Sequence, residues 1–586
     1  MTNTQKETHR VAQETGCTVS VLSLDLEDRT PANLLRFFRQ ALQRGSRLVM
    51  VPFGFPDLEG GSAESFFSSL AQEHRVHLVA GYLEDDRRVA AVFLPDGSVA
   101  GRYAQTHRLP DETFRTGDEI KPIATSLGSI GLSIGSDIFF PEVHWSLGQQ
   151  GADFLVHLDI DRGINEHFYS VLSPKVRAFD LHRPVVVVAP SSCYLKLPHN
   201  EEMQLGGTPM SGSYIADQNG AVLASTGFSQ GIATADLRLY QHCQSREQRV
   251  NLPISKGLDL WKLYFNDSRK RYFGPLKAPY APTPKPPYSK RKIRVAVVTQ
   301  TFFDDFDKAS AALIDLIEGA CAMKPDIVVC TEMWYEWRPE EPRVAKAFER
   351  MAEITSAAGA YLLIGGIRCH KPGTKADRAS HGWLWDRSGN RVFESIIMLY
   401  GRGCGQGYFD TDFGRIGIRL CGDVYAPELD RLFALEDVDI VFNPSQSWGA
   451  SGLINTELNQ VRAMDNGHFV VSSHTAFSDP GQRSHVIDPM GFVVAASSFY
   501  CDDFLVADID LDGKRGIFVK EGTRGEIKSD AYLRRYRTLD YRRLLSRPEI
   551  MNLRRPELYA MIDEDVPNHP FTTRDRGDGC YIPPKE

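Results

Sequence analysis

The sequence has 586 residues, which is too long for a single hydrophobic core and predicts two or more domains. Its composition, with 42% hydrophobic and 24% charged residues, is typical of a globular protein and excludes a mostly disordered or fibrous chain. The formal net charge of -8 is modest and basic residues are spread along the chain, so we expect no nucleic acid partner.

The N-terminal residues, 1–17, are polar and lack the apolar segment of a signal peptide, so we predict a tail there. No stretch approaches the roughly 18 apolar residues that a membrane span needs, and we therefore expect no membrane partner and a cytoplasmic location. The ten cysteines occur singly, without the spacing of a zinc site or of a disulfide framework. We expect no metal.

Short apolar runs alternate with amphipathic stretches along both halves of the chain. Residues 34–42 present one apolar helical face before a predicted strand at 48–51, and residues 313–320 do the same before a predicted strand at 327–330. Apolar runs such as 185–189 suit strands that are covered on both faces. Alternation over about 250 residues in each half predicts α/β layered domains.

A segment rich in proline and lysine, 274–292, separates the two halves. Its six prolines favour extended polyproline conformations over a packed core. We predict a linker there, between a domain at 18–273 and a domain at 293–540. A C-terminal extension follows at 541–586.

The Arg-rich stretch 534–555 has two interpretations. It could form a basic patch, but Tyr and Leu are interspersed among the arginines. We therefore favour a solvated amphipathic helix with a structural role.

The second half repeats the first. The offset between matching segments is 286 positions at the start and 285 at the end, which indicates a duplicated domain. The matching pairs are 128–131 and 414–417, Asp137 and Asp423, 141–142 and 427–428, 153–156 and 439–442, and 177–180 and 462–465.

Residues 413–428, FGRIGIRLCGDVYAPE, resemble the strand and elbow that carry the nucleophile in the nitrilase superfamily of carbon-nitrogen hydrolases. The resemblance covers residues 293 to about 560 and, through the repeat, 18 to about 240. Further segments resemble family motifs in the same order: VVCTE at 328–332, NPS at 443–445, RAMDN at 462–466, DPMG at 488–491 and RRPELY at 554–559.

The resemblance implies two four-layer α-β-β-α sandwiches in tandem. Because dimers in that family stack two sandwiches, we expect the two halves to pack as an intrachain pseudo-dimer, and homo-oligomers of this unit are possible. The resemblance also implies a cofactor-free enzyme that acts on a small-molecule substrate.

The family's chemistry uses a cysteine nucleophile, a glutamate that carries protons and a lysine that supports the oxyanion. Position by position, Cys421 matches the nucleophile and Glu332 the glutamate, and the Gly422 N–H would be an oxyanion donor. Trp448 and His474 fall where the family lines its pocket, although either residue could belong to the core.

The family's lysine has no direct counterpart. It should lie eight residues after a turn glycine, and that count from Gly389 ends at Ile397. If the strand is a few residues longer, Arg402 supplies the cation, an interpretation that we slightly favour. An arginine can stabilise an oxyanion, but at a pKa above about 12 it cannot relay protons.

The N-terminal half lacks all three groups. Phe53 occupies the glutamate position, Gln105 the lysine position and Gly135 the cysteine position. We therefore expect that half to have no catalytic activity of its own.

Three functional hypotheses follow. In the first, the Cys421 thiol attacks a small amide, nitrile or related substrate and the resulting thioester passes to water. In the second, the acyl group passes to an amine or another nucleophile, because a site without the lysine activates water poorly. In the third, the chain is a non-catalytic scaffold with the nitrilase fold.

Overall fold

The computed structural model divides into two compact units, one made chiefly of Met1–Arg108 and Glu112–Asn251 and the other chiefly of Leu252–Asp565. The structure describes residues 15–24, 30–54, 60–160, 167–181, 183–190, 194–196, 202–204, 212–227, 229–239, 274–301, 303, 305–337, 342–369, 378–396, 407–446, 452–476, 483–498, 501–513, 518–524 and 539–559. Within these ranges, no helix is both long and apolar enough to cross a membrane.

The N-terminal unit contains two six-stranded sheets. In sheet order, the strands of the first sheet are β14 (Gly231–Leu239), β1 (Thr15–Ser23), β2 (Leu48–Met50), β3 (His77–Glu84), β4 (Arg87–Phe93) and β5 (Val99–Ala104). Those of the second sheet are β13 (Val222–Ser225), β12 (Tyr214–Ala216), β9 (Val185–Val188), β8 (Phe154–Leu158), β7 (Gly128–Ile134) and β6 (Ile123–Thr125). A separate two-stranded sheet pairs β10 (Tyr194–Lys196) with β11 (Glu202–Gln204).

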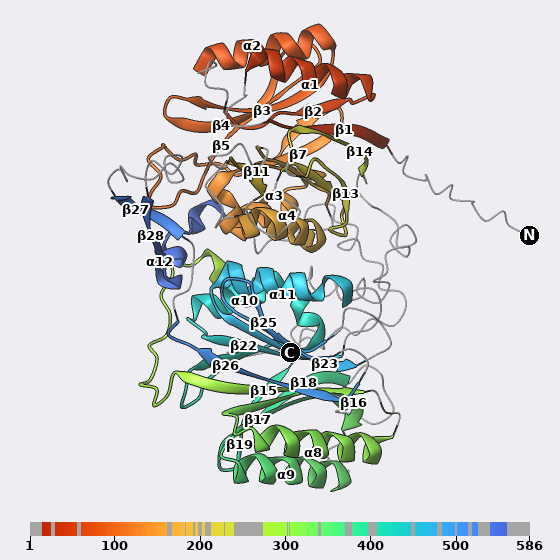
Figure 1. Ribbon diagram of the computed structural model, residues 1–586, viewed down its shortest axis with the longest axis vertical. Helices are drawn as coiled ribbons and strands as arrows, with labels where there is room; N and C mark the ends of the chain where they lie inside the picture. Colours follow the sequence, from red (N-terminus) through yellow and green to blue (C-terminus); the bar gives the residue numbers. More distant parts are fainter. Residues whose placement is uncertain are drawn as a thin grey trace, which may run out of the picture. The chain divides into compact units, whose positions relative to one another are not determined.

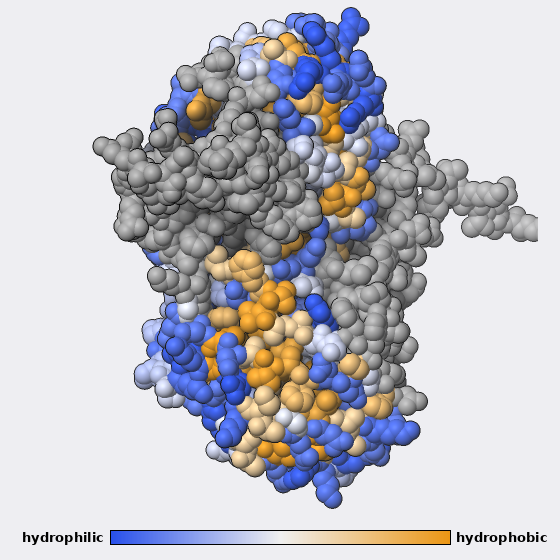
Figure 2. Space-filling model, in the orientation of Figure 1, coloured by the Kyte–Doolittle hydropathy of each residue, from blue (hydrophilic) through white to orange (hydrophobic). Residues whose placement is uncertain are grey.

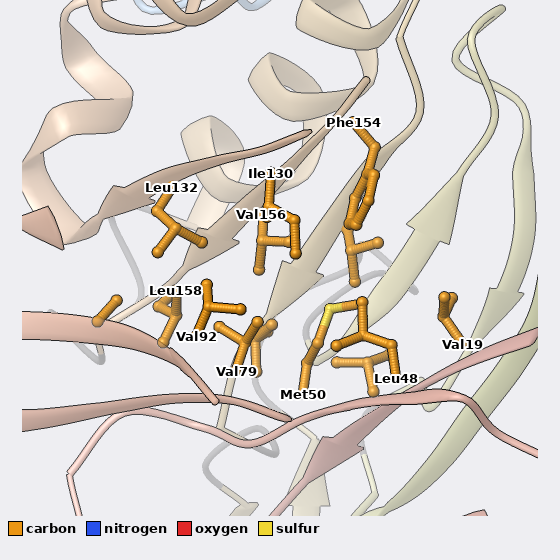
Figure 3. Close-up of a cluster of buried hydrophobic side chains, with 14 of the residues drawn as sticks. Val19, Leu48, Met50, Val79, Val92, Ile130, Leu132, Phe154, Val156 and Leu158 are labelled. Atoms are coloured by element: carbon orange, nitrogen blue, oxygen red, sulfur yellow. The ribbon is translucent and has the colours of Figure 1, made fainter. Parts of the chain in front are cut away.

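The two sheets face each other across an apolar core. Figure 3 shows Met50 and Val79 of the first sheet pointing toward Ile130 and Val156 of the second. Strand residues alternate between this core and the helices on the outer faces, because successive side chains of a strand point to opposite sides. Burial on both faces explains why these strands are almost uniformly apolar.

Four helices cover the outer faces of the two sheets. They are α1 (Pro31–Gln43) and α2 (Gly60–His74) on the first sheet, and α3 (Pro141–Gln149) and α4 (His167–Leu181) on the second (Figure 1). Thr30 caps the start of helix α1, where its side chain accepts the Asn33 N–H, and the helix buries Leu34 and Phe38 as the sequence predicts.

The C-terminal unit repeats this strand order in two arrays. The first array is β26 (Asp503–Asp510), β15 (Lys292–Thr301), β16 (Ile327–Trp337), β17 (Tyr361–Cys369), β18 (Arg378–Trp385) and β19 (Arg391–Ile396). The second is β25 (Val493–Ala496), β24 (His485–Ile487), β23 (Phe469–Ala476), β22 (Ile440–Ser445), β21 (Arg415–Ile418) and β20 (Tyr408–Asp410). Pairing of β15 with β23 joins the arrays into one continuous sheet of 12 strands.

Helices again cover both arrays. Figure 1 shows α8 (Phe306–Ala322) and α9 (Pro342–Ala357) on the first, and α10 (Pro427–Leu435) and α11 (Gly452–Asn466) on the second. The predicted tandem of α-β-β-α sandwiches is therefore confirmed. The packing of the two units as a pseudo-dimer stays a prediction.

The Pro-rich segment 274–292 is not a free tether. It lacks long regular elements, as predicted, but Leu276 is buried and Lys285 forms an ion pair with Asp439 at 3.1 Å. The buried Arg415 guanidinium donates to the backbone carbonyl of Thr283. Polar contacts of this kind fix an extended segment to a domain even though the segment itself has no apolar face.

The prediction of a solvated helix at 534–555 is wrong for the residues described. Residues 539–544 form strand β28 (Leu539–Leu544), which pairs antiparallel with β27 (Phe518–Arg524). A short helix, α12 (Arg547–Asn552), follows, and the Arg547 side chain is buried, with its guanidinium donating to the Gly467 carbonyl at 2.7 Å. Strand pairing has overridden the helical pattern.

Some apolar side chains remain at the surface. Figure 2 shows apolar residues gathered on the face of the C-terminal unit that is in view. In each unit, the outermost strand of the second array carries exposed apolar residues, Val222 and Leu223 on β13, and Val493 and Val494 on β25.

Candidate active site

Cys421 begins a 3₁₀ turn, Cys421–Tyr425, directly after the strand β21 and residues 419–420. The Asp423 carboxylate accepts the Leu420 N–H at 3.1 Å and so fixes the start of the turn. The Cys421 backbone has φ 43°, in the left-handed region that a residue with a side chain adopts at a cost. This bend presents the thiol to the space between the two arrays.

Glu332 reaches the same place from the first array. Its side chain lies on β16, is buried, and forms a hydrogen bond with the Cys421 thiol. Gly365, which pairs with Glu332 on β17, leaves the room for this approach, because a Cβ at Gly365 would lie 3.0 Å from the Glu332 Cα. The two predicted catalytic residues are therefore in contact.

The backbone of Gln446 joins the two groups. Its carbonyl accepts the Cys421 thiol at 3.5 Å, and its N–H donates to the Glu332 carboxylate. Gln446 directly follows the NPS motif, whose Ser445 also bonds the thiol. Neither residue stands among those predicted, although the motif marks their position in the chain.

Ser380 was not anticipated from the sequence either. It lies on β18 and its hydroxyl donates to Oε1 of Glu332. Both side chains are buried. No local motif marks Ser380, because its contact with Glu332 arises from pairing among three strands.

Burial governs the protonation of this site. Burial raises the pKa of the Cys421 thiol well above its usual value, and the adjacent Glu332 carboxylate raises that pKa further. Burial also raises the pKa of Glu332, while hydrogen bonds from Ser380, Cys421 and the Gln446 backbone oppose the rise. At rest, therefore, the proton stays on sulfur and Glu332 is the base placed to receive it.

The Gly422 N–H is the second backbone N–H of the 3₁₀ turn. The first N–H groups of a helical turn have no acceptor within it, so they are available to an oxyanion. Gly422 itself is buried at the base of the site.

The strand register bears on the missing lysine. In the N-terminal unit Gly81 pairs with Ala90, and Ala90 with Tyr103, two residues before Gln105. In the C-terminal unit the corresponding chain of pairs is Gly365, Gly382 and Ser395, so Ser395 corresponds in register to Tyr103. Up to Ile396, therefore, these strands contain no inserted residue relative to the strands of the N-terminal unit. Ile397, Arg402 and Trp448 lie outside the described residues, so the roles of Arg402 and Trp448 stay predictions.

His474 lies in a second group of polar side chains. Its ring bonds the Ser472 hydroxyl at 2.8 Å and lies near the ring of His485, with 5.6 Å between ring centroids. Burial, together with the charges of His485 and Arg419, lowers the pKa of His474 to about 3. His474 is therefore neutral, and its predicted role in substrate binding stays untested.

The elbow of the N-terminal unit is preserved without its chemistry. Gly135 has φ 48°, close to that of Cys421, and Gln105 Oε1 lies 3.3 Å from where a Cβ at Gly135 would be. Phe53 belongs to the apolar core between the sheets and contacts Gly81 so closely that a side chain there would collide with its ring. Phe53 and Gln105 therefore fill the position that Glu332 and its neighbours occupy in the other unit.

Comparison with known proteins identifies the family of the chain. The model of the carbon-nitrogen hydrolase family matches twice, over residues 34–245 and 294–516, which together are more than half of the chain. A deaminated glutathione amidase of Synechocystis sp. is 28% identical over 246 residues, covering 36% of this chain and 87% of that protein.

An omega-amidase of Homo sapiens is 23% identical over 265 residues, covering 39% of this chain and 91% of that protein. Among solved structures, a carbon-nitrogen hydrolase of Helicobacter pylori G27 is similar, with 23% identity, a TM-score of 0.34, and coverage of 40% of this chain and 93% of that one. The chain therefore belongs to the carbon-nitrogen hydrolase family of enzymes, with two copies of the family's domain in tandem.

Proposed function

We propose that this protein hydrolyses a small amide through a covalent intermediate on Cys421. The observation that carries the proposal is the hydrogen bond between the Cys421 thiol and the Glu332 carboxylate, two groups brought together from different arrays. A buried thiol with a raised pKa is a poor nucleophile, but a carboxylate in contact with it removes that obstacle by accepting the proton.

The first half-reaction forms a thioester. The sulfur attacks the amide carbon as the thiol proton moves to Glu332, and the carbonyl oxygen becomes an oxyanion that faces the Gly422 N–H. Collapse of this intermediate breaks the C–N bond. Glu332 returns its proton to the leaving nitrogen, and ammonia or an amine departs.

The second half-reaction releases the acid. A water molecule attacks the thioester carbon while Glu332 accepts one of its protons. The new oxyanion collapses, the C–S bond breaks and the proton returns to sulfur. The products are a carboxylic acid and the free Cys421 thiol.

A panel of amides tests this proposal. The amides named for the similar proteins, deaminated glutathione and ω-amides, would be supplied together with short aliphatic amides, and ammonia release would be measured. Wild type is expected to release ammonia from at least one of them. Cys421→Ala should abolish release, and Glu332→Gln should lower it by about 10²–10⁴-fold.

The matched control is Cys501→Ala, which removes an exposed cysteine and should leave the rate unchanged. Full activity of Cys421→Ala would refute the proposal. It would also show that the N-terminal half carries chemistry despite Phe53, Gln105 and Gly135.

Acyl transfer is the second candidate, and the sequence favours it because the count from the turn glycine to the family's lysine position ends at Ile397. A site without that cation activates water less well than an amine that is already nucleophilic. Hydroxylamine added to the assay distinguishes the two activities. A product that is mainly hydroxamate, at a raised total turnover, indicates transfer, whereas mainly free acid indicates hydrolysis.

A further inference from the structure

Ser380 lies on β18, two strands away from Glu332 on β16, and its hydroxyl donates to Oε1 of Glu332. Strand β17 lies between β16 and β18, so the hydroxyl crosses a full strand to reach the carboxylate. The crossing is possible because Gly365, on the intervening strand, presents no side chain. A Cβ at Gly365 would lie 2.7 Å from the Pro444 side chain and 3.0 Å from the Glu332 Cα.

The bond has a defined chemical effect on the carboxylate. A hydroxyl that donates to a carboxylate stabilises its charged form, and here it opposes the burial that raises the pKa of Glu332. It also fixes Oε1, which limits rotation of the carboxyl group beside the Cys421 thiol. Both effects serve a base that must be ionised and aligned before it accepts a proton.

The N-terminal unit supplies an independent comparison. Arg88 lies two residues before Ala90, as Ser380 lies two residues before Gly382, so the two side chains occupy equivalent register positions. Arg88 donates to Gln105 Oε1 at 3.2 Å and also bonds Glu112. A side chain at this position therefore reaches the site in both units. It is a hydroxyl where the site holds a glutamate and a guanidinium where Phe53 has replaced that glutamate.

We propose that Ser380 is a positioning residue for the reaction, which holds Glu332 ionised and aligned so that it accepts the Cys421 proton. This inference rests on the proposed function for its role in turnover. Its test uses a chemical probe that needs no amide hydrolysis.

The probe is iodoacetamide, and the measured quantity is its rate of reaction with Cys421 from pH 4.5 to 8. The Cys421 sulfur forms a bond to the probe's methylene carbon, the C–I bond breaks, iodide leaves and Glu332 takes the thiol proton. The rate is read from the mass of the peptide that contains Cys421, because Cys501 is exposed and also reacts.

In wild type the rate should fall on the acid side as Glu332 becomes protonated. Ser380→Ala removes the donor, and the midpoint of this fall should move up by about one pH unit, which is the effect of losing a hydrogen bond to a charged group. Below the midpoint, labelling should then be about tenfold slower. Ser380→Thr keeps the hydroxyl on a strand that suits threonine and should keep the wild-type midpoint.

Glu332→Gln is the reference, since its thiol reacts only as the small thiolate fraction: labelling should be slower, and its rate should change by about tenfold per pH unit without the wild-type midpoint. An unchanged midpoint in Ser380→Ala, or an equal shift in Ser380→Thr, would overturn the inference. Persistence of the wild-type midpoint in Glu332→Gln would do the same. Absence of ammonia release by wild type would refute amide hydrolysis alone, because the labelling midpoints decide the role of Ser380 without it.

Discussion

The backbone at Cys421 adopts a left-handed conformation that is disfavoured for a residue with a side chain. Cys421 and Gly135 occupy the same point of the elbow and have φ values of 43° and 48°. Glycine adopts this conformation freely, whereas a residue with a Cβ is disfavoured there by about 1–2 kcal/mol. The C-terminal unit retains the strained cysteine and the N-terminal unit has the relaxed glycine, which agrees with a reactive role for the thiol.

This strain gives a stability prediction. Cys421→Gly should be more stable than Cys421→Ala by about 1 kcal/mol, because alanine keeps the Cβ that is disfavoured at this φ. Both variants should lack amide hydrolysis. Urea unfolding of the two proteins measures the difference, and a less stable glycine variant would argue against strain at the elbow.

Motifs predict the residues that lie within a recognisable stretch of chain, and they predict little beyond them. Cys421, Gly422 and Glu332 follow from the elbow and from the apolar run that ends in a carboxylate. Ser380 and the Gln446 backbone do not, because their contacts depend on which strands pair and in what register. Pairing is a property of the folded sheet that no single segment displays.

At the scale of elements, a buried ion pair ties helix α10 to the end of the nucleophile strand. The Arg419 guanidinium, two residues before Cys421, bonds the carboxylate of Asp430 on α10. The His468 ring also bonds that carboxylate, at 3.2 Å, and Asn459 of α11 accepts from Arg419. Burial alone would raise the pKa of Asp430, but the Arg419 charge and the His468 bond bring that pKa below its usual value.

Removing one charge of this pair should be costly. Asp430→Asn leaves the Arg419 guanidinium buried without its counter-charge and should destabilise the C-terminal unit by about 3–5 kcal/mol. The double variant Arg419→Met with Asp430→Leu removes both charges and should cost less. Urea unfolding compares the three proteins, and a double variant as unstable as Asp430→Asn would contradict this account.

Apolar periodicity predicts the elements, but it does not predict such pairs. The amphipathic patterns at 34–42 and 313–320 correctly give α1 and α8, since their apolar faces are the faces that become buried. The same reasoning places charged residues at the surface. It therefore misses the buried Arg419, just after β21, and the buried Asp430 on α10. It also fails for β28, where pairing with β27 decides the structure.

At the scale of the whole chain, duplication has preserved the fold more than the chemistry. Both units have the same strand order, the same elbow and an aspartate that fixes the turn, Asp137 in one and Asp423 in the other. Only the C-terminal unit places a thiol and a carboxylate together at that elbow. The turns that build the elbow need particular residues. The sequence therefore shows the internal repeat at these turns.

Buried histidines in both units make the stability of the chain dependent on pH. Burial lowers the pKa of His157, His468 and His485 to about 4, that of His474 to about 3, and that of His144 well below its usual value. In the unfolded chain these rings titrate near 6.5. Between about pH 6.5 and 4 the unfolded chain therefore binds more protons than the folded one, and acid favours unfolding.

The urea midpoint should accordingly be highest above about pH 7 and fall steadily toward pH 5. The raised pKa values of Glu332 and Asp488 act in the opposite sense, because the folded chain then takes up protons first. These two carboxyl groups are fewer than the five buried histidines. Equilibrium unfolding at several pH values measures the trend. A midpoint that rises toward pH 5 would contradict the neutral, buried state of these rings.

The most direct test of the central claim is the mass of the Cys421 peptide after brief reaction with an amide from the panel and quenching in acid. We expect an adduct on Cys421 equal in mass to the amide minus ammonia, absent in Cys421→Ala and lost on longer incubation as the acid is released. Ammonia release without any adduct on Cys421, or an adduct on another cysteine, would contradict it.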